Sequence, residues 1–126
     1  MNKVPMLILY VSAQQRSKDF YSAILGIKPL LDVPGMTEFK LSEGLLLGLM
    51  PEKGIAKIIC PVMPEPSKGS GIPRCELYLF VTEPDRTLDL AVKNGAKLIS
   101  QAKPRDWGDT VAYCADPDGH ILAFAK

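Results

Sequence analysis

Two short apolar runs recur along the chain and predict buried strands. They cover residues 7–11 (LILYV) and 77–81 (LYLFV), and each ends in a valine. Both are rich in branched and aromatic side chains and apolar at every position, which is typical of strands covered on both faces. By strand alternation one set of side chains should face the helices, namely Leu7, Leu9, Leu77, Leu79 and Val81.

The two runs are part of a longer internal repeat. Val11 and Val81 are separated by 70 positions (81 − 11), and at the same offset Arg16 matches Arg86. The hairpin glycines that follow are related by an offset of 75 (119 − 44). Each match is weak by itself, but the ordered set indicates a duplicated unit.

Each apolar run is followed by a helical pattern. The spacing predicts helices over about 14–25 and 85–94, with Ser12 and Thr82 as their caps and a glycine after each. The residues expected on the buried stripes are Phe20, Ile24, Leu25, Leu88, Ala91 and Val92.

Three further strands complete each unit. The last two form a hairpin, over about 38–41 and 45–49 in the first unit and over about 110–114 and 121–124 in the second. We therefore expect an α+β fold of two paired β-α-β-β-β modules.

The expected domain organisation is a single domain, 1–126, with one module over about 4–50 and the other over about 75–126. The segment 51–74, rich in proline and glycine, is interpreted as a linker without a regular element. A lid and a contact with a partner subunit are the two roles open to it.

Composition narrows the function classes. The chain has 126 residues, with 15 basic and 14 acidic side chains, so no electrostatic attraction to nucleic acid or an anionic membrane is expected. No apolar run is long enough to cross a bilayer, and no secretory signal is apparent. The three cysteines form no CxxC pair, so neither a disulfide framework nor a cysteine zinc site is indicated. We expect a cytoplasmic protein.

The ordered motifs resemble those of the vicinal oxygen chelate superfamily, which includes glyoxalase I, ring-cleaving dioxygenases and bleomycin-resistance proteins. The similarity is carried by residues 11–17, 20–21 and 25–26 in the first unit and by 107–108 and 116–119 (DPDG) in the second. It implies that the two modules form a curved mixed sheet around a cleft, with helices on the outer face. It also implies a homodimer.

In that superfamily, metal ligands stand near the start of the first strand and on the last strand of each module. The matching positions here are Met6, Gly48, Glu76 and Ala123. One carboxylate and one soft thioether do not make a site for a divalent Lewis-acid ion, which takes imidazole and carboxylate ligands. We therefore expect no metal and no other cofactor.

Alternation places a second set of side chains toward the cleft, namely Met6, Ile8, Tyr10, Glu76, Tyr78 and Phe80. Gly48 and Ala123 leave space beside them, and Trp107 lies on a polar loop at the expected rim. The expected binding residues for a small organic molecule are Met6, Ile8, Tyr10, Gly48, Glu76, Tyr78, Trp107 and Ala123. The alternative is that this face collapses into a second core or a dimer interface.

Several residues have two interpretations. Glu76 is either a desolvated general base or a solvated glutamate at a strand end. Trp107 either stacks on a planar ligand, with Lys103 or Arg105 beside it to meet an anionic group, or packs under its loop. His120, the single histidine, is interpreted as a solvated turn residue, and Cys60 and Cys114 as buried structural thiols.

Three functions remain open. The first is a metal-independent protein, similar to the bleomycin-resistance branch, that binds a small, partly aromatic or apolar molecule. The second is a metal-dependent glyoxalase I-like lyase, isomerase or dioxygenase, with His120 and Glu43 as reserve ligands. The third is an isomerase or epimerase without metal, in which Glu76 abstracts a proton.

Overall fold

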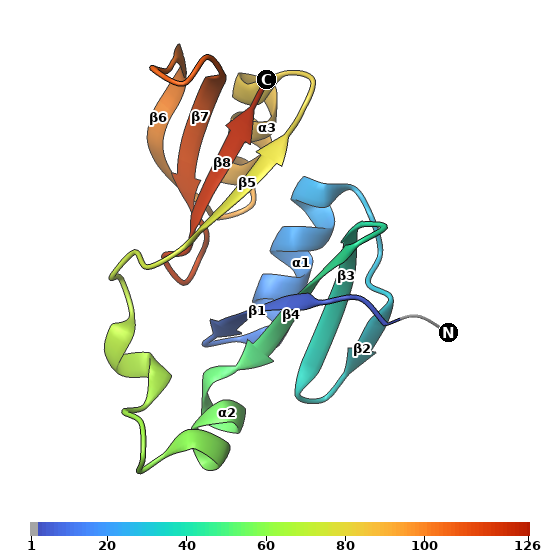
Figure 1. Cartoon of the computed structure of the whole chain (residues 1–126), viewed down its shortest axis with the longest axis vertical. Coiled ribbons are helices and arrows are strands. Elements are labelled where there is room, and N and C mark those ends of the chain that lie inside the picture. Colours follow the sequence, from blue (N-terminus) through green and yellow to red (C-terminus); the bar gives the residue numbers. More distant parts are fainter. Residues whose placement is uncertain (1–2) are drawn as a thin grey trace. The chain divides into compact units, whose positions relative to one another are not determined.

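The computed structural model describes residues 3–126 and divides the chain into two compact units between Ser70 and Gly71. Figure 1 shows that each unit combines an open sheet with helical structure, which in the second unit is α3 alone. The α+β class is confirmed, and the two units are described separately below.

The first unit contains a four-stranded sheet in the order β1-β4-β3-β2. Its elements are β1 (Met6–Val11), α1 (Gln14–Leu25), β2 (Leu31–Val33), β3 (Met36–Ser42), β4 (Leu45–Pro51), α2 (Glu52–Ile59) and a 3-10 helix, η1 (Pro66–Gly69). The β1 and β4 strands are parallel, and the remaining pairs are antiparallel.

The second unit repeats this topology with the order β5-β8-β7-β6. Its elements are β5 (Glu76–Phe80), α3 (Pro84–Lys93), β6 (Lys97–Pro104), β7 (Thr110–Ala115) and β8 (Ile121–Ala125). The register repeats as well, because Ile8 pairs with Gly48 in one sheet and Tyr78 with Ala123 in the other. The predicted duplication of a β-α-β-β-β unit is confirmed.

The core of the first unit lies between α1 and the sheet. Phe20 and Tyr21 are buried on α1, and their rings meet edge to face with centroids 5.0 Å apart. They share this core with Phe39 on β3 and with Leu47 and Leu49 on β4, all fully buried. The buried stripe of α1 places these aromatic rings against the apolar sheet, where burying them stabilises the unit.

The second core lies between α3 and β6–β8. Leu88 and Ala91 of α3 are fully buried, as are Leu122 and Phe124 of β8. Val92 was predicted to face inward and remains 38% exposed. That prediction is wrong, because α3 is centred on its Leu88–Ala91 stripe, which turns Val92 toward the helix flank.

The predicted caps are also wrong. The N-caps are Ala13 and Glu83, and neither makes a side-chain capping bond. Ser12 lies one residue too early, and its Oγ accepts a hydrogen bond of 2.8 Å from Arg16. Each N-cap lies one residue later than the sequence pattern predicts, so Ala13 and Glu83 occupy the N-cap positions and Ser12 and Thr82 precede them.

The expectation of a linker without regular structure is corrected by α2 and η1, which both fall within 51–74. Ile55 is buried on α2, and this helix packs against β1 and β4. The helix lies between Pro51 and Pro61. A proline is tolerated at a helix start, and a proline disfavours the helical conformation in the residue before it, so these two prolines are compatible with the bounds of α2. Within residues 3–126, no helix is both long and apolar enough to cross a membrane.

Candidate functional site

In the first unit, the sheet face turned away from the buried core carries three of the predicted residues together. Met6 and Ile8 lie on β1, and Gly48 lies opposite Ile8 on β4. A Cβ atom added to Gly48 would stand 2.8 Å from Met6 Sδ, 3.1 Å from Ile8 Cγ1 and 3.3 Å from Met36 Sδ. The space that the missing side chain leaves is therefore taken by two thioethers.

Tyr10 follows on the same face of β1, opposite Met50, and is 37% exposed. Met36 has no place among the predicted residues, although its position on β3 brings it over Gly48. The only signal for Met36 in the sequence is its apolar type at a strand start, which does not distinguish it from an ordinary core residue.

In the second unit, Ala123 lies between two tyrosines, paired with Tyr78 on one side and with Tyr113 on the other. It is fully buried and packs with Val111 and Ala125. A metal ligand at this position would have to displace packed apolar atoms, and alanine supplies no donor. Glu76, two residues before Tyr78, is exposed.

The four positions that correspond to superfamily metal ligands do not fit a divalent ion. Gly48 and Ala123 have no donor atom, Met6 offers a soft thioether, and Glu76 supplies the single carboxylate. Throughout residues 3–126, no three His, Cys, Asp or Glu side chains gather as a metal site. The reserve ligands His120 and Glu43 lie in separate units.

A hydrogen-bonded chain of three side chains stands out on the second sheet. The indole Nε1–H of Trp107 donates to Tyr78 Oη at 2.9 Å, and the Tyr78 hydroxyl donates to Asp109 Oδ2 at 2.6 Å. Desolvation and the bond to Asp109 raise the pKa of Tyr78 above its ordinary value. The Tyr78 hydroxyl therefore remains a neutral donor across the physiological pH range.

Further aromatic surface adjoins these three hydrogen-bonded side chains. The rings of Tyr78 and Phe80 meet edge to face at 5.4 Å. Phe80 is 72% exposed and Trp107 is 59% exposed. We call the side chains of Tyr78, Phe80 and Trp107 the aromatic platform; Tyr78 meets Phe80 through its ring and Trp107 through the hydrogen bond.

Arg105 supports the same region from beside β7. Its guanidinium lies 5.0 Å from the centre of the Tyr113 ring and donates to the Val111 carbonyl at 2.9 Å and to Ser100 Oγ at 2.8 Å. These bonds occupy the guanidinium within the hairpin. Lys103 is exposed on β6.

The structure combines features of both interpretations of Trp107. The indole is exposed, as stacking requires, and it is also tied to the sheet through its N–H. Asp109, at the end of that series of hydrogen bonds, is not among the residues predicted from the sequence. Its position two residues after Trp107 is compatible with many loops, so only the folded hairpin identifies it.

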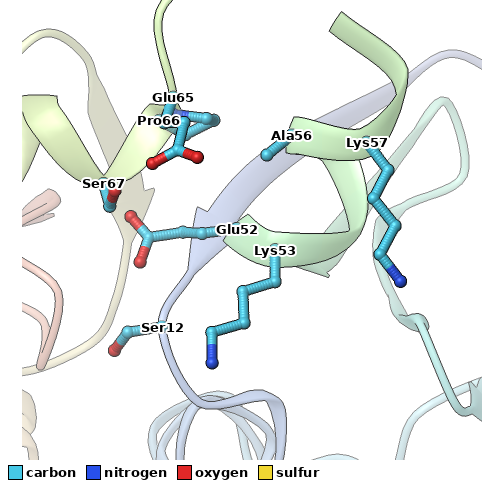
Figure 2. A pocket seen from close by; sticks show the side chains of 8 residues that line it. All are labelled: Ser12, Glu52, Lys53, Ala56, Lys57, Glu65, Pro66 and Ser67. Carbon is cyan, nitrogen blue, oxygen red and sulfur yellow. The ribbon is translucent and has the colours of Figure 1, made fainter. Parts of the chain in front are cut away.

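A hollow of about 590 Å³ lies in the first unit between the end of β1, α2 and η1. Figure 2 shows the carboxylates of Glu52 and Glu65 together with Ser67 on one side, and Lys53 beside Ser12 on the other. None of the predicted binding residues lines it. We name it the α2 hollow.

The histidine and the cysteines take separate places. His120 is half-buried in its turn, where its backbone N–H donates to Asp116 Oδ1 at 2.9 Å. Cys114 is fully buried, as predicted, and desolvation raises the pKa of its thiol to about 12. Cys60 is half-buried and Cys75 is exposed.

Comparison with known proteins identifies the family and the fold. A family model described as a glyoxalase-like domain matches residues 4–126. A search of curated proteins gives no match.

Solved structures share the fold over nearly the whole chain. A glyoxalase-related enzyme from Fulvimarina pelagi is 21% identical, with a TM-score of 0.81, covering 99% of this chain and 88% of its own. A protein from Agrobacterium tumefaciens is 29% identical, with a TM-score of 0.75, covering 99% and 97%. A glyoxalase/bleomycin resistance protein/dioxygenase family enzyme from Burkholderia phytofirmans PsJN is 14% identical, with a TM-score of 0.81, covering 95% and 94%.

Proposed function

This chain belongs to the glyoxalase-like domain family, and on that premise we propose that it binds a small, partly aromatic or apolar organic molecule without a metal ion. The binding surface is the aromatic platform of the second unit. The fold alone does not select this function, because related folds host unrelated chemistry.

The exposed aromatic platform is the observation that carries the proposal. Phe80 and Trp107 keep 72% and 59% of their surface exposed, yet both adjoin the anchored ring of Tyr78. Stacking a planar ligand on such rings removes apolar surface from water and adds favourable ring contacts. Because the indole is already anchored, little side-chain freedom is lost on binding.

The donor chemistry supports metal independence. A catalytic divalent ion takes about three imidazole or carboxylate ligands from the protein. The corresponding positions here present one carboxylate, on Glu76, and packed apolar atoms at Gly48 and Ala123. The same donor set therefore favours metal-independent binding over a metal-dependent lyase, isomerase or dioxygenase.

The isomerase alternative depends on Glu76 as a base. Glu76 is exposed at the start of β5, where water solvates its carboxylate. General-base catalysis requires the carboxylate to be held against a bound substrate, and the exposure of Glu76 therefore favours binding over this function.

Binding is tested by titrating the wild-type protein with a panel of planar aromatic compounds and following thermal unfolding. A true ligand stabilises the folded protein by about 2.7 kcal/mol at a hundredfold excess over Kd. The change Trp107→Ala should weaken binding of such a ligand about tenfold, since a stacked aromatic contact is lost. Leu98→Ala, which truncates an exposed side chain of β6, is the matched control. A panel without any thermal shift would overturn the proposal.

Metal independence is tested by calorimetric titration of chelator-treated protein with zinc, nickel and manganese. We expect no stoichiometric site of micromolar affinity. If such a site were found, the placement of the four positions would be wrong, and assays of glyoxalase-type isomerisation and ring cleavage would follow.

A further inference from the structure

We propose that Tyr78 and Asp109 are positioning residues that hold the Trp107 indole in a fixed orientation, so that the ring face rather than the indole N–H meets the ligand. The inference deepens the proposed function and rests on it. The ligand class that it names is planar aromatic rings. Tyr78 and Asp109 act on such a ligand by fixing the orientation of Trp107.

The direction of the hydrogen bonds determines which part of Trp107 is available to a ligand. Indole has a single hydrogen-bond donor, and the Trp107 Nε1–H donates to Tyr78 Oη at 2.9 Å. The Tyr78 hydroxyl in turn donates to Asp109 Oδ2 at 2.6 Å. Because Asp109 fixes where that hydrogen points, a lone pair of Tyr78 Oη stays directed at the indole. A ligand therefore finds no free donor on Trp107 and meets its ring face.

Strand pairing and a loop hydrogen bond place the two side chains that hold the indole. Tyr78 lies in β5, the edge strand of the second sheet, where it pairs with Ala123 of β8. Asp109 closes the loop that carries Trp107, because its carbonyl accepts the Arg105 amide at 2.8 Å. The loop turns at Gly108, whose φ of 105° is open to glycine and strained for other residues. The indole is thus held by its side chain as well as by its backbone.

Rigidity matters here because an exposed tryptophan ordinarily samples several rotamers. Ordering a free side chain on binding costs about 0.5–1.5 kcal/mol, which weakens a complex that depends on stacking. A tether that fixes the ring before binding removes this cost and selects ligands that are flat. Arg105 is not part of the ligand contact, because its guanidinium is hydrogen-bonded to Val111 and Ser100.

The first arm of the test needs no ligand. Trp107 is the single tryptophan of the chain, so fluorescence reports on it alone. Tyr78→Phe keeps the ring and removes the hydroxyl, and it should lower the fluorescence anisotropy and increase quenching by acrylamide. Asp109→Asn should produce a smaller change in the same direction. Tyr113→Phe and Asp106→Asn, which alter the same face and the same loop, should leave both readouts at the wild-type values.

The second arm measures binding of 2-naphthol and of its saturated analogue 2-decalol by calorimetry. We expect the wild-type protein to prefer the planar compound, and Tyr78→Phe to weaken 2-naphthol binding roughly two- to tenfold, as loss of one hydrogen bond implies. Tyr113→Phe should keep the wild-type affinity. Unfolding by urea, measured for each variant, shows that the compared proteins are folded.

The outcomes separate the two proposals. Wild-type anisotropy in Tyr78→Phe would overturn the positioning roles, whatever binds. Greater indole mobility in Tyr78→Phe, combined with no binding of any planar compound to the wild type, would support the positioning and overturn the proposed function. Equal affinity of Tyr78→Phe and wild type for 2-naphthol would overturn the inference while leaving the binding function in place.

Discussion

Gly48 and Ala123 show how neighbours decide what a residue does. Both stand where the superfamily places a metal ligand, and both are small. Gly48 is covered by the sulfur atoms of Met6 and Met36, whereas Ala123 is enclosed between Tyr78 and Tyr113. Two different packings thus replace the same kind of ligand in the two units.

The packing over Gly48 gives a prediction. A Cβ atom there would stand 2.8 Å from Met6 Sδ, so Gly48→Ala should destabilise the protein by about 1 kcal/mol, since the flexible thioether can move aside. Met6→Ala in the same chain should remove that clash, and the two changes should therefore be non-additive in urea unfolding. Gly44→Ala, in the turn between β3 and β4, where an added Cβ meets no atom within 4 Å, is the control. Additive effects of the Gly48 and Met6 changes would contradict this packing.

The cysteines differ in reactivity for a physical reason. Burial raises the pKa of Cys114 to about 12, so its thiol stays protonated and shielded, whereas Cys75 is exposed. We expect a thiol reagent at pH 8 to label Cys75 rapidly and Cys114 only after unfolding, as measured by mass spectrometry of peptides. Rapid labelling of Cys114 in the folded protein would show that its core is open.

The same pKa has a consequence for stability. In the unfolded chain a thiol ionises near pH 8.5, and the folded value is about 12. Because the folded pKa is raised, the contribution of the protonated thiol is complete below about pH 8.5 and is lost as the pH rises toward 12. Cys114→Ala should flatten the fall in stability over this alkaline range, as followed by urea unfolding at several pH values.

Among the helices, α2 is one that the sequence pattern does not predict. Ile55 is 9% exposed on this helix, whereas Ile58 is 72% exposed. We expect Ile55→Ala to lower the free energy of unfolding by about 2 kcal/mol, as for a buried isoleucine, and Ile58→Ala to change it by less than about 0.5 kcal/mol. Equal effects of the two changes would mean that residues 52–59 do not pack as a helix on β1 and β4.

The regular elements differ in how far local patterns predict them. The helix over 14–25 is correct at both ends because an apolar stripe begins after a buried strand and stops at Gly26, whose φ is 67°. The α2 helix is missed because prolines at 51, 61, 64 and 66 resemble a linker, and its single buried side chain gives too little periodicity. Cap positions are missed because they depend on one residue of register.

The repeated topology implies that the two units share one ancestral β-α-β-β-β unit. They differ in the side chains on the sheet face turned away from the buried core. The first presents methionines and the second presents aromatic rings. Large apolar side chains that stay exposed include Leu30, Val62 and Phe80. Exposed apolar surface of this kind favours association of copies.

We therefore expect a homodimer, as the superfamily resemblance implies. Sedimentation equilibrium should give twice the mass of the chain at micromolar concentration. The change Leu30→Lys, at a side chain that is 63% exposed, tests whether the first unit takes part, and Lys53→Glu serves as a charge-changing control. A monomer at every concentration would contradict the expectation.

Residue types and their spacing along the chain were enough to predict the duplicated β-α-β-β-β pattern and the buried positions Phe20, Leu88 and Ala91. The tertiary structure alone decided which side chains meet: Met36 over Gly48, Asp109 behind Tyr78, and Tyr78 beneath Trp107. These contacts join residues from different strands and loops, and strand register and loop closure set them. No local pattern records register, so the hydrogen-bonded chain that holds the indole appears only when the sheet is formed.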